Sequence, residues 1–247
     1  MKKRNLAVVA LSETRVDANI KDFEINIRGN SQVKCDAENG YIGGVVIYIR
    51  NDIKYETVMV QRVTGSYCCV EIGLYEKWYK GTIVILYHSS SAPDGIFIKF
   101  IKDLIEDLIV KEPCIVIGDF NIDLRLDTFY SNKLKNVMSC LGMKQYVVQP
   151  TRMTINSCTL IDLVCANLDL SGCVTVVENP KITNHLWVRI EFKTSQDENY
   201  YKEVGGRAYK RMNMQNFVSE LQRNVVDNDI KRARDRAYRK AVYTGLE

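Results

Sequence analysis

Short apolar runs separated by polar turn residues dominate the chain up to residue 193. Runs rich in Val, Ile and Tyr, bounded by Gly, Asn, Asp or Ser, are typical of β-strands. The pattern predicts strands over these ranges: Leu6 to Leu11, Phe23 to Ile27, Gly43 to Ile49, Tyr55 to Val60, Tyr67 to Leu74, Thr82 to Tyr87, Cys114 to Gly118, Gln145 to Val148, Leu160 to Cys165, Val174 to Val177 and Leu186 to Phe192.

Two segments follow a helical period instead. From Phe97 to Val110, apolar residues recur three and four positions apart, which predicts an amphipathic helix. A second helix is predicted from Phe129 to Leu141, where Gly142 occupies the position that commonly follows a helix end. Because strands dominate and the helices are interleaved among them without a repeat, we predict an α/β domain. Its two sheets would pack face to face with helices outside.

The C-terminal part of the chain has a different composition. Polar residues predict a linker over 194–211, after which 212–247 contains two helical segments with too little apolar surface to form a core. From Tyr200 to Glu247 there are 11 Lys and Arg against 6 Asp and Glu, whereas the remainder contains 23 against 24. The net charge of +4 therefore belongs to a basic helical tail, and the charge of the domain at 1–193 gives no support for a nucleic-acid groove.

Length, hydropathy and cysteine usage limit the class of protein. At 247 residues and 46% hydrophobic, the chain can bury one large core and carry an appendage. No apolar run is long enough to cross a membrane, and Ser12-Glu13 interrupts the first run too early for a signal peptide. The eight cysteines fall mostly inside apolar runs without CxxC spacing, which predicts reduced core thiols in an intracellular protein, without disulfides or a zinc site.

The predicted strand at 114–118 ends in a carboxylate and a carboxamide. Asp119 and Asn121 stand two positions apart, so in extended chain their side chains point to the same side. Hard oxygen ligands of this kind suit Mg²⁺. An Asx turn that closes an αβ unit explains the same residues equally well, because Gly, Asp and Asn are ordinary turn residues.

Other polar residues stand at or inside predicted strands. Glu13 and Tyr87 end two of them, and His185 opens the last. Asp162 lies within an apolar run, where a carboxylate is unfavourable unless it is paired or hydrogen-bonded. Each residue also has a purely structural interpretation: an exposed acid, a core aromatic, a buried hydrogen bond or a structural histidine. None of them is decisive alone.

Taken together and in this order, these residues resemble the endonuclease/exonuclease/phosphatase superfamily. Pro150 to Arg152, ahead of the apolar run with Asp162, is similar to the apurinic-type endonuclease domain of non-LTR (LINE-like) retrotransposons. The resemblance covers about residues 6 to 193 and implies a four-layer αββα sandwich of two mixed sheets flanked by helices. It rests on these segments: Ser12-Glu13-Thr14, Gly43-Gly44-Val45, Tyr87-His88-Ser89-Ser90, Gly118-Asp119-Phe120-Asn121, Pro150-Thr151-Arg152 and Leu160-Ile161-Asp162-Leu163-Val164.

The resemblance implies a metal-dependent phosphodiester hydrolase acting on the phosphate backbone of DNA. Glu13, Asp119 and Asn121 would hold Mg²⁺, for which Mn²⁺ can substitute. Asp119 would also orient or deprotonate the attacking water, which Asn121 would position. His185, oriented by Asp162, would stabilise the charge that builds on the phosphate.

Further roles follow from the same resemblance. Tyr87 would hydrogen-bond the phosphate or the leaving oxygen, and the hydroxyls of Thr151 and Thr159 would lie near the phosphate. In the parent element such a domain accompanies a reverse transcriptase, and Arg234 to Ala241 is similar to the segment between the two. The family's substrate implies nuclear residence. We expect a monomer without membrane attachment.

The sequence departs from the family pattern in two places. The family has Ser-Asp-His where this chain has Thr183-Asn184-His185, and Asn cannot act as a base and is a weaker ligand at this substrate-binding position. The family also begins with a strand that precedes the one ending at Glu13, so we expect an N-terminally truncated domain that lacks this strand. Three functions stay open: a DNA-nicking endonuclease, a decayed remnant that binds nucleic acid or nothing, and a small-phosphoester phosphatase. The Pro150 to Arg152 context argues against the phosphatase.

Overall fold

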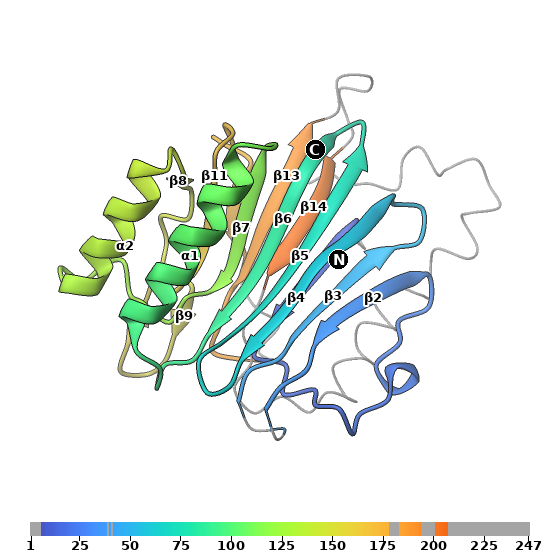
Figure 1. The fold of residues 1–247 in the computed structure, drawn as a ribbon, viewed down its shortest axis with the longest axis horizontal. Helices are drawn as coiled ribbons and strands as arrows, with labels where there is room; N and C mark the ends of the chain where they lie inside the picture. Colours follow the sequence, from blue (N-terminus) through green and yellow to red (C-terminus); the bar gives the residue numbers. More distant parts are fainter. Residues whose placement is uncertain (1–5, 39, 41, 178–182, 194–200, 207–247) are drawn as a thin grey trace.

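The computed structural model describes residues 6–38, 40, 42–177, 183–193 and 201–206. Two six-stranded sheets face each other (Figure 1). The first sheet contains, in order of neighbouring strands, β12 (Val174–Val177), β13 (Trp187–Lys193), β14 (Tyr201–Gly206), β1 (Val8–Ser12), β3 (Val45–Arg50) and β2 (Asn30–Cys35). The second contains β4 (Tyr55–Val63), β5 (Tyr67–Glu76), β6 (Tyr79–His88), β7 (Cys114–Asp119), β11 (Asp162–Ala166) and β8 (Lys144–Gln145). A hairpin pairs β9 (Arg152–Met153) with β10 (Cys158–Thr159).

The α-helices cover the outer face of the second sheet. α1 (Asp94–Ile109) and α2 (Phe129–Cys140) lie side by side (Figure 1), and Gly142 follows α2 with a φ of 68° in the predicted helix-ending role. The predicted helical period of α1 is confirmed by the residues it buries. They are Phe97, Ile98, Ile101, Ile105 and Leu108.

Irregular chain, rather than an α-helix, packs on the outer face of the first sheet. Residues alternate along β3, so Ile47 faces the core between the sheets while Val46 and Tyr48 face outward. The irregular segment after β1, with a single 3-10 turn at Asp22–Glu24, packs on that outward side, and the Tyr48 hydroxyl donates a hydrogen bond to the Ile25 carbonyl at 2.7 Å. In the described ranges, helices therefore flank one sheet only, in place of the two helical layers expected for the sandwich.

On the first sheet's side of the chain, one strand prediction is wrong and one strand was not predicted. The predicted strand from Phe23 to Ile27 is irregular chain, and Phe23 is 78% exposed. The strand that the pattern missed is β2, whose sequence is mostly polar. As an edge strand, β2 is held through backbone pairing with β3, and this pairing does not require an apolar run. In the second sheet, β8 is shorter than predicted and ends at Gln145.

Strand β14 lies inside the predicted linker and stands between β13 and β1 in the first sheet. It pairs parallel with β1, Val8 opposite Val204, and antiparallel with β13, Val188 opposite Gly206. Without it, β1 and β13 would each present a row of unpaired backbone groups. The sheet is therefore continuous across this position. The helices predicted at 212–247 lie outside the described residues.

The thiols and helices agree with a compact α/β core. Cys68, Cys69, Cys114 and Cys165 are buried with free thiols, as the apolar runs around them predict. Within the described ranges, no helix combines the length and the apolar composition that crossing a bilayer requires.

Candidate functional site

Strand direction brings the polar strand ends to one edge between the sheets. β6 and β7 run parallel and end together, and β11, antiparallel to β7, begins at the same edge with Asp162. In the first sheet, β1 ends at Ser12, while β13 runs in the opposite direction and begins just after His185. Strand direction within each sheet and contacts between the sheets therefore bring Glu13, Asp119, Asp162 and His185 to a shared rim.

Three side chains form a row across the second sheet. Tyr87 stands opposite Asp119 in the ladder between β6 and β7, and Asp119 stands opposite Asp162 in the ladder between β7 and β11. Residues directly opposite one another share a face of the sheet, so all three point toward the first sheet. Gly118 makes this pairing possible, because its φ is 144° and a Cβ there would lie 1.9 Å from the Leu86 carbonyl oxygen.

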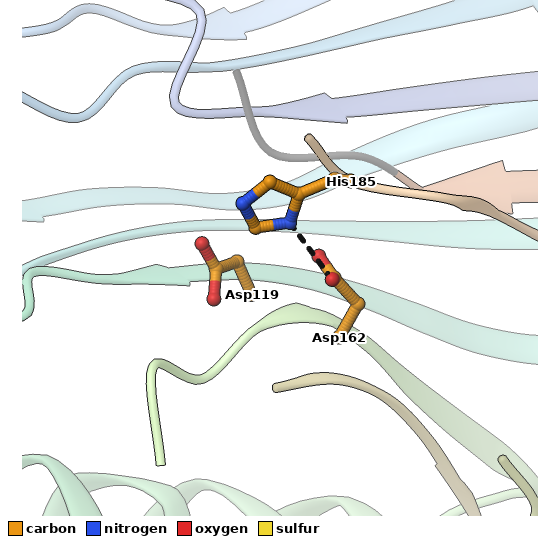
Figure 2. A group of neighbouring side chains, drawn as sticks. All are labelled: Asp119, Asp162 and His185. Carbon is orange, nitrogen blue, oxygen red and sulfur yellow. Dashed lines mark hydrogen bonds and ion pairs between the residues drawn. The ribbon is translucent and has the colours of Figure 1, made fainter. Parts of the chain in front are cut away.

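Asp119, Asp162 and His185 form a buried cluster (Figure 2). Their nearest ligand atoms all lie within 4.8 Å of one another. The His185 Nδ1 is 2.9 Å from Asp162 Oδ2, so this nitrogen donates to the carboxylate. The main chain fixes the histidine as well, because Arg152 and His185 form an isolated β-bridge.

The charges in the cluster perturb one another. Burial opposes the protonated form of His185, but the Asp162 carboxylate and the hydrogen bond to it outweigh this effect and raise the pKa of the imidazole. Burial and the charge of Asp162 raise the pKa of Asp119 to about 8, against the opposing influence of His185 and of the Asn121 N–H. The neighbouring buried carboxyls therefore disfavour each other's ionisation, which a cation bound beside them would offset.

Asn121 reaches Asp119 through a turn. Its φ is 48°, a left-handed conformation that side-chain-bearing residues rarely adopt, so the extended geometry predicted for this pair is wrong. The Asn121 N–H donates to Asp119 Oδ1 at 3.0 Å, and its Nδ2 donates to Asp119 Oδ2 at 3.2 Å and to the His88 carbonyl at 2.7 Å. The first of these bonds is an Asx turn. The Asx turn and the ligand pair are therefore compatible interpretations of the motif. The turn brings the carboxylate and the amide together and leaves the amide oxygen of Asn121 for a ligand.

Glu13 comes from the first sheet on strained backbone. Its φ is 54°, and the following chain bonds to the glycine pair, with Thr14 N–H donating to the Gly44 carbonyl at 3.1 Å. A Cβ at Gly44 would lie 2.6 Å from the Thr14 hydroxyl, so only glycine permits this approach. The Tyr87 hydroxyl donates to Glu13 Oε1 at 3.5 Å. Burial and the charges of Glu13 and Asp119 raise the pKa of Tyr87, which keeps it a protonated donor.

The three remaining predicted site residues lie in different environments. The buried Thr151 hydroxyl accepts hydrogen bonds from the Asp162 N–H at 2.9 Å and the Ile161 N–H at 3.3 Å, so it anchors the start of β11. The Thr159 hydroxyl is buried and has no partner among the described residues. Asn184 is exposed, and its carbonyl accepts from the Met153 N–H at 2.8 Å.

The donor chemistry of this rim fits a magnesium-sized cation. Glu13 and Asp119 supply carboxylate oxygens and Asn121 supplies an amide oxygen, which are the ligand types that Mg²⁺ prefers. Asp162 Oδ1 and the hydroxyls of Ser12, Thr14 and Thr159 are buried without partners in the described part of the chain. Such orphaned atoms are unfavourable unless a ligand or water completes them.

Sequence reasoning missed two sets of residues in and behind the rim. Ser12 and Thr14 flank Glu13 and are as buried as it is, yet a hydroxyl beside an acid carries no distinct signal. His88 follows Tyr87 and bonds to the loop that carries Asn121. Its signal is weak but present, because it is one of only 2 histidines in the chain.

Asp119, Asp162 and His185 form a buried group whose carboxylates and imidazole could hold a metal ion. The chain belongs to the endonuclease/exonuclease/phosphatase family, whose model matches residues 1–188. Enzymes of this family typically use a divalent metal.

Solved structures show the same fold at low sequence identity. The endonuclease domain of TRAS1, a telomere-specific non-LTR retrotransposon, is 17% identical with a TM-score of 0.55, and the match covers 72% of this chain and 94% of that domain. An endonuclease/exonuclease/phosphatase family protein from Leptotrichia buccalis is 15% identical with a TM-score of 0.50, and the match covers 75% of this chain and 87% of the other. No curated protein sequence is significantly similar to the chain.

Proposed function

We propose that the protein is a Mg²⁺-dependent phosphodiesterase that nicks DNA and leaves a 3′-hydroxyl. The observation that carries the proposal is the buried cluster of Asp119, Asp162 and His185, with Glu13 and Asn121 at the same rim. Family membership supports hydrolysis of a phosphoester. The fold shared with a retrotransposon endonuclease agrees with DNA as the substrate, as does the sequence around Pro150 to Arg152.

Glu13, Asp119 and Asn121 would hold the cation. Magnesium bound there supplies Lewis-acid polarisation of a phosphate oxygen and favours deprotonation of water. Asn121 uses its Nδ2 hydrogens on Asp119 and on the His88 carbonyl, which orients its amide oxygen as the ligand atom. Mn²⁺ takes the same oxygen ligands.

The side chains divide the work of one hydrolytic step. A water oxygen bonds to phosphorus, its proton passes to Asp119, and the bond from phosphorus to O3′ breaks, which gives a 3′-hydroxyl and a 5′-phosphate. Burial and the charge of Asp162 raise the pKa of Asp119 to about 8 without metal, whereas a cation held by this carboxylate would favour its ionised form, which can accept the water proton. His185 donates Nδ1–H to Asp162, and its raised pKa favours the imidazolium form, which also presents Nε2–H to the phosphate charge. Tyr87 donates a hydrogen bond from its hydroxyl to the phosphate or to the leaving oxygen, and the leaving O3′ takes up a proton from solvent water.

The cellular setting follows from this activity. The partner is the phosphate backbone of DNA, and a reverse transcriptase domain would use the 3′-hydroxyl as a primer in the parent element. Such a function requires nuclear residence and is compatible with a monomer, because all the proposed site residues come from one chain.

Relaxation of supercoiled plasmid tests the proposal. With Mg²⁺ the full chain converts supercoiled to open-circular plasmid, EDTA stops the conversion, and Asp119→Ala loses it. Products carry a 3′-hydroxyl that a DNA polymerase extends. A parent protein that leaves the plasmid supercoiled with both Mg²⁺ and Mn²⁺ would contradict the proposal.

A decayed copy is the second candidate, and Asn184 favours it. The family resemblance implies an acid where this chain has Asn, but the Asn184 side chain is exposed, whereas the side chains of the cluster are buried. Comparing the parent with Asn184→Asp therefore distinguishes a decayed site from an active one. Nicking by Asn184→Asp alone means a site inactivated by this single change, whereas equal nicking by both proteins means that the acid is dispensable here.

A further inference from the structure

His88 lies beneath the loop that joins Asp119 to Asn121. It ends β6, its side chain is completely buried, and its ring stacks on Phe97 of α1 with centroids 4.0 Å apart and planes 2° from parallel. Its ring therefore points toward the helices, away from the rim where Tyr87, the preceding residue, faces Glu13. None of the hydrolytic roles above uses it.

Two hydrogen bonds connect His88 to that loop. The ring Nδ1 is 2.9 Å from the Phe120 carbonyl oxygen, and the His88 carbonyl accepts from Asn121 Nδ2 at 2.7 Å. A carbonyl oxygen can only accept, so Nδ1 must carry the proton. Burial lowers the pKa of the imidazole, which makes the neutral ring with a proton on Nδ1 the stable form. Asp94 lies 3.9 Å from the same nitrogen, beyond a normal hydrogen bond.

The first of these bonds acts on Asp119 through one peptide group. The Phe120 carbonyl and the Asn121 N–H belong to the same planar trans peptide, so they point in opposite directions. His88 holds the carbonyl end, while the N–H end donates to Asp119 Oδ1 at 3.0 Å. Because hydrogen bonds in series polarise one another, the imidazole also strengthens the bond that reaches the carboxylate.

The loop needs such a support. Asn121 is in a left-handed conformation that is unfavourable for a residue with a side chain, and it persists only where its surroundings impose it. On the other side, the Phe120 N–H donates to the Ile161 carbonyl at 2.8 Å. Among the described contacts, His88 is the one side chain that hydrogen-bonds to the Phe120 carbonyl of the Phe120–Asn121 peptide.

We infer that His88 is a positioning residue that sets the orientation of Asp119 and Asn121 through its Nδ1–H bond to the Phe120 carbonyl. This inference rests on the proposed function for its consequence in catalysis and on geometry for its consequence in the loop. The inferred role requires a hydrogen-bond donor at the position of Nδ1. An aromatic ring that only packs against Phe97 cannot replace this donor.

A matched set of variants separates the donor from the packing. His88→Phe keeps a ring to stack on Phe97 and removes the donor. His88→Asn places its amide nitrogen close to the position of Nδ1 and restores the donor without the ring. Phe97→Leu weakens the stacking and leaves the donor intact, so it serves as the control for reduced stability.

In the loop, we expect His88→Phe to increase hydrogen exchange of the Asn121 amide by about tenfold, as the loss of one hydrogen bond implies. His88→Asn restores slow exchange, and Phe97→Leu leaves it slow. Mn²⁺ affinity, measured by calorimetry on the full chain, falls about 10- to 100-fold in His88→Phe and recovers in His88→Asn. In nicking, kcat of His88→Phe falls by the same factor while KM for plasmid stays within about twofold.

The outcomes distinguish this inference from the proposed function. If the parent does not nick plasmid, the proposed function fails, and the Asn121 exchange and Mn²⁺ affinity still decide the role of His88. Unchanged exchange and affinity in His88→Phe would overturn the inference, whatever the activity. Equal losses in His88→Phe and Phe97→Leu would also overturn it, because packing alone would then explain the effect.

Discussion

The two sheets present their site residues in different ways. The second sheet holds Tyr87, Asp119 and Asp162 inside hydrogen-bonded strands, where the ladder register places them in one row. The first sheet presents Glu13 and His185 on chain just outside its strands. Regular strand pairing therefore sets the positions of the site side chains in the second sheet. In the first sheet, their positions depend on local turns and on the pairing of the strands that these turns follow or precede.

Because of this difference, charge dominates the behaviour of the site residues in the second sheet, and backbone conformation determines the position of those in the first. In the row of the second sheet, two buried acids stand opposite each other, and burial together with the charge of Asp162 raises the pKa of Asp119. In the first sheet, Glu13 depends on a left-handed backbone that rests against Gly44. Substitutions that remove a charge and keep the side-chain shape should therefore have their largest effects in the row of the second sheet. Substitutions that alter the backbone should have their largest effects in the first sheet.

The largest effect is expected at the centre of the row. Asp119→Asn keeps the shape of the side chain and removes its charge and its capacity to accept a proton. We expect the nicking rate to fall by about 10² to 10⁴, the range for loss of a general base. Plasmid nicking at saturating Mg²⁺ measures the change, and a loss below tenfold would mean that Asp119 is not central.

The same variant gives a pH prediction. Burial and Asp162 raise the pKa of Asp119 from 3.8 to about 8, so the folded protein holds a proton that the unfolded chain has released. The stability from this proton is complete below the unfolded value and is lost as pH rises through the folded value. Without metal, the parent should therefore lose stability relative to Asp119→Asn between pH 4 and pH 8, and Mg²⁺ should reverse the loss. Parallel melting curves at every pH would contradict this.

The next effect is expected in the first sheet. Val204 lies in β14 opposite Val8 and Ile190, so Val204→Pro removes an N–H from a strand paired on both sides. We expect the free energy of unfolding to fall by about 3 kcal/mol or more. Chemical denaturation measures it, with Val204→Ala as the control that keeps the N–H. If both variants unfold alike, β14 does not contribute to the sheet.

A smaller effect is expected at the partner of His185. Asp162→Asn removes the charge that raises the pKa of the imidazole, so deprotonation and the loss of activity move to lower pH. We also expect kcat to fall about 10- to 100-fold, as for loss of a hydrogen-bonded orienting group. The pH dependence of nicking measures both, and Asp169→Asn, which changes an exposed acid, is the control. An unchanged basic limb in Asp162→Asn would contradict the pairing.

The sequence predicted the second sheet better than the first, and the reason is physical. β5, β6 and β7 are buried and read as long apolar runs, and the period of α1 follows from the face it buries. In contrast, β2 and β14 are polar and are held by backbone pairing with their neighbours, which leaves no apolar pattern to detect.

The site could be predicted only in its membership. The order of motifs predicted Glu13, Asp119, Asp162 and His185 as site residues, and the structure places all four near one edge of the sheets. Geometry beyond that was not accessible: the left-handed turn at Asn121 depends on bonds to Asp119 and His88. The use of the Thr151 hydroxyl as an anchor for β11 depends on tertiary contacts for the same reason.

Mn²⁺ binding to the full chain tests the central claim most directly, namely that carboxylates from both sheets share one cation. Calorimetry on the parent should show one site, weakened at least about tenfold in Glu13→Gln and in Asp119→Asn and nearly unchanged in Asp162→Asn. Tight binding that survives Glu13→Gln but is lost in Asp162→Asn would place the cation among Asp119, Asp162 and His185 and would contradict the account.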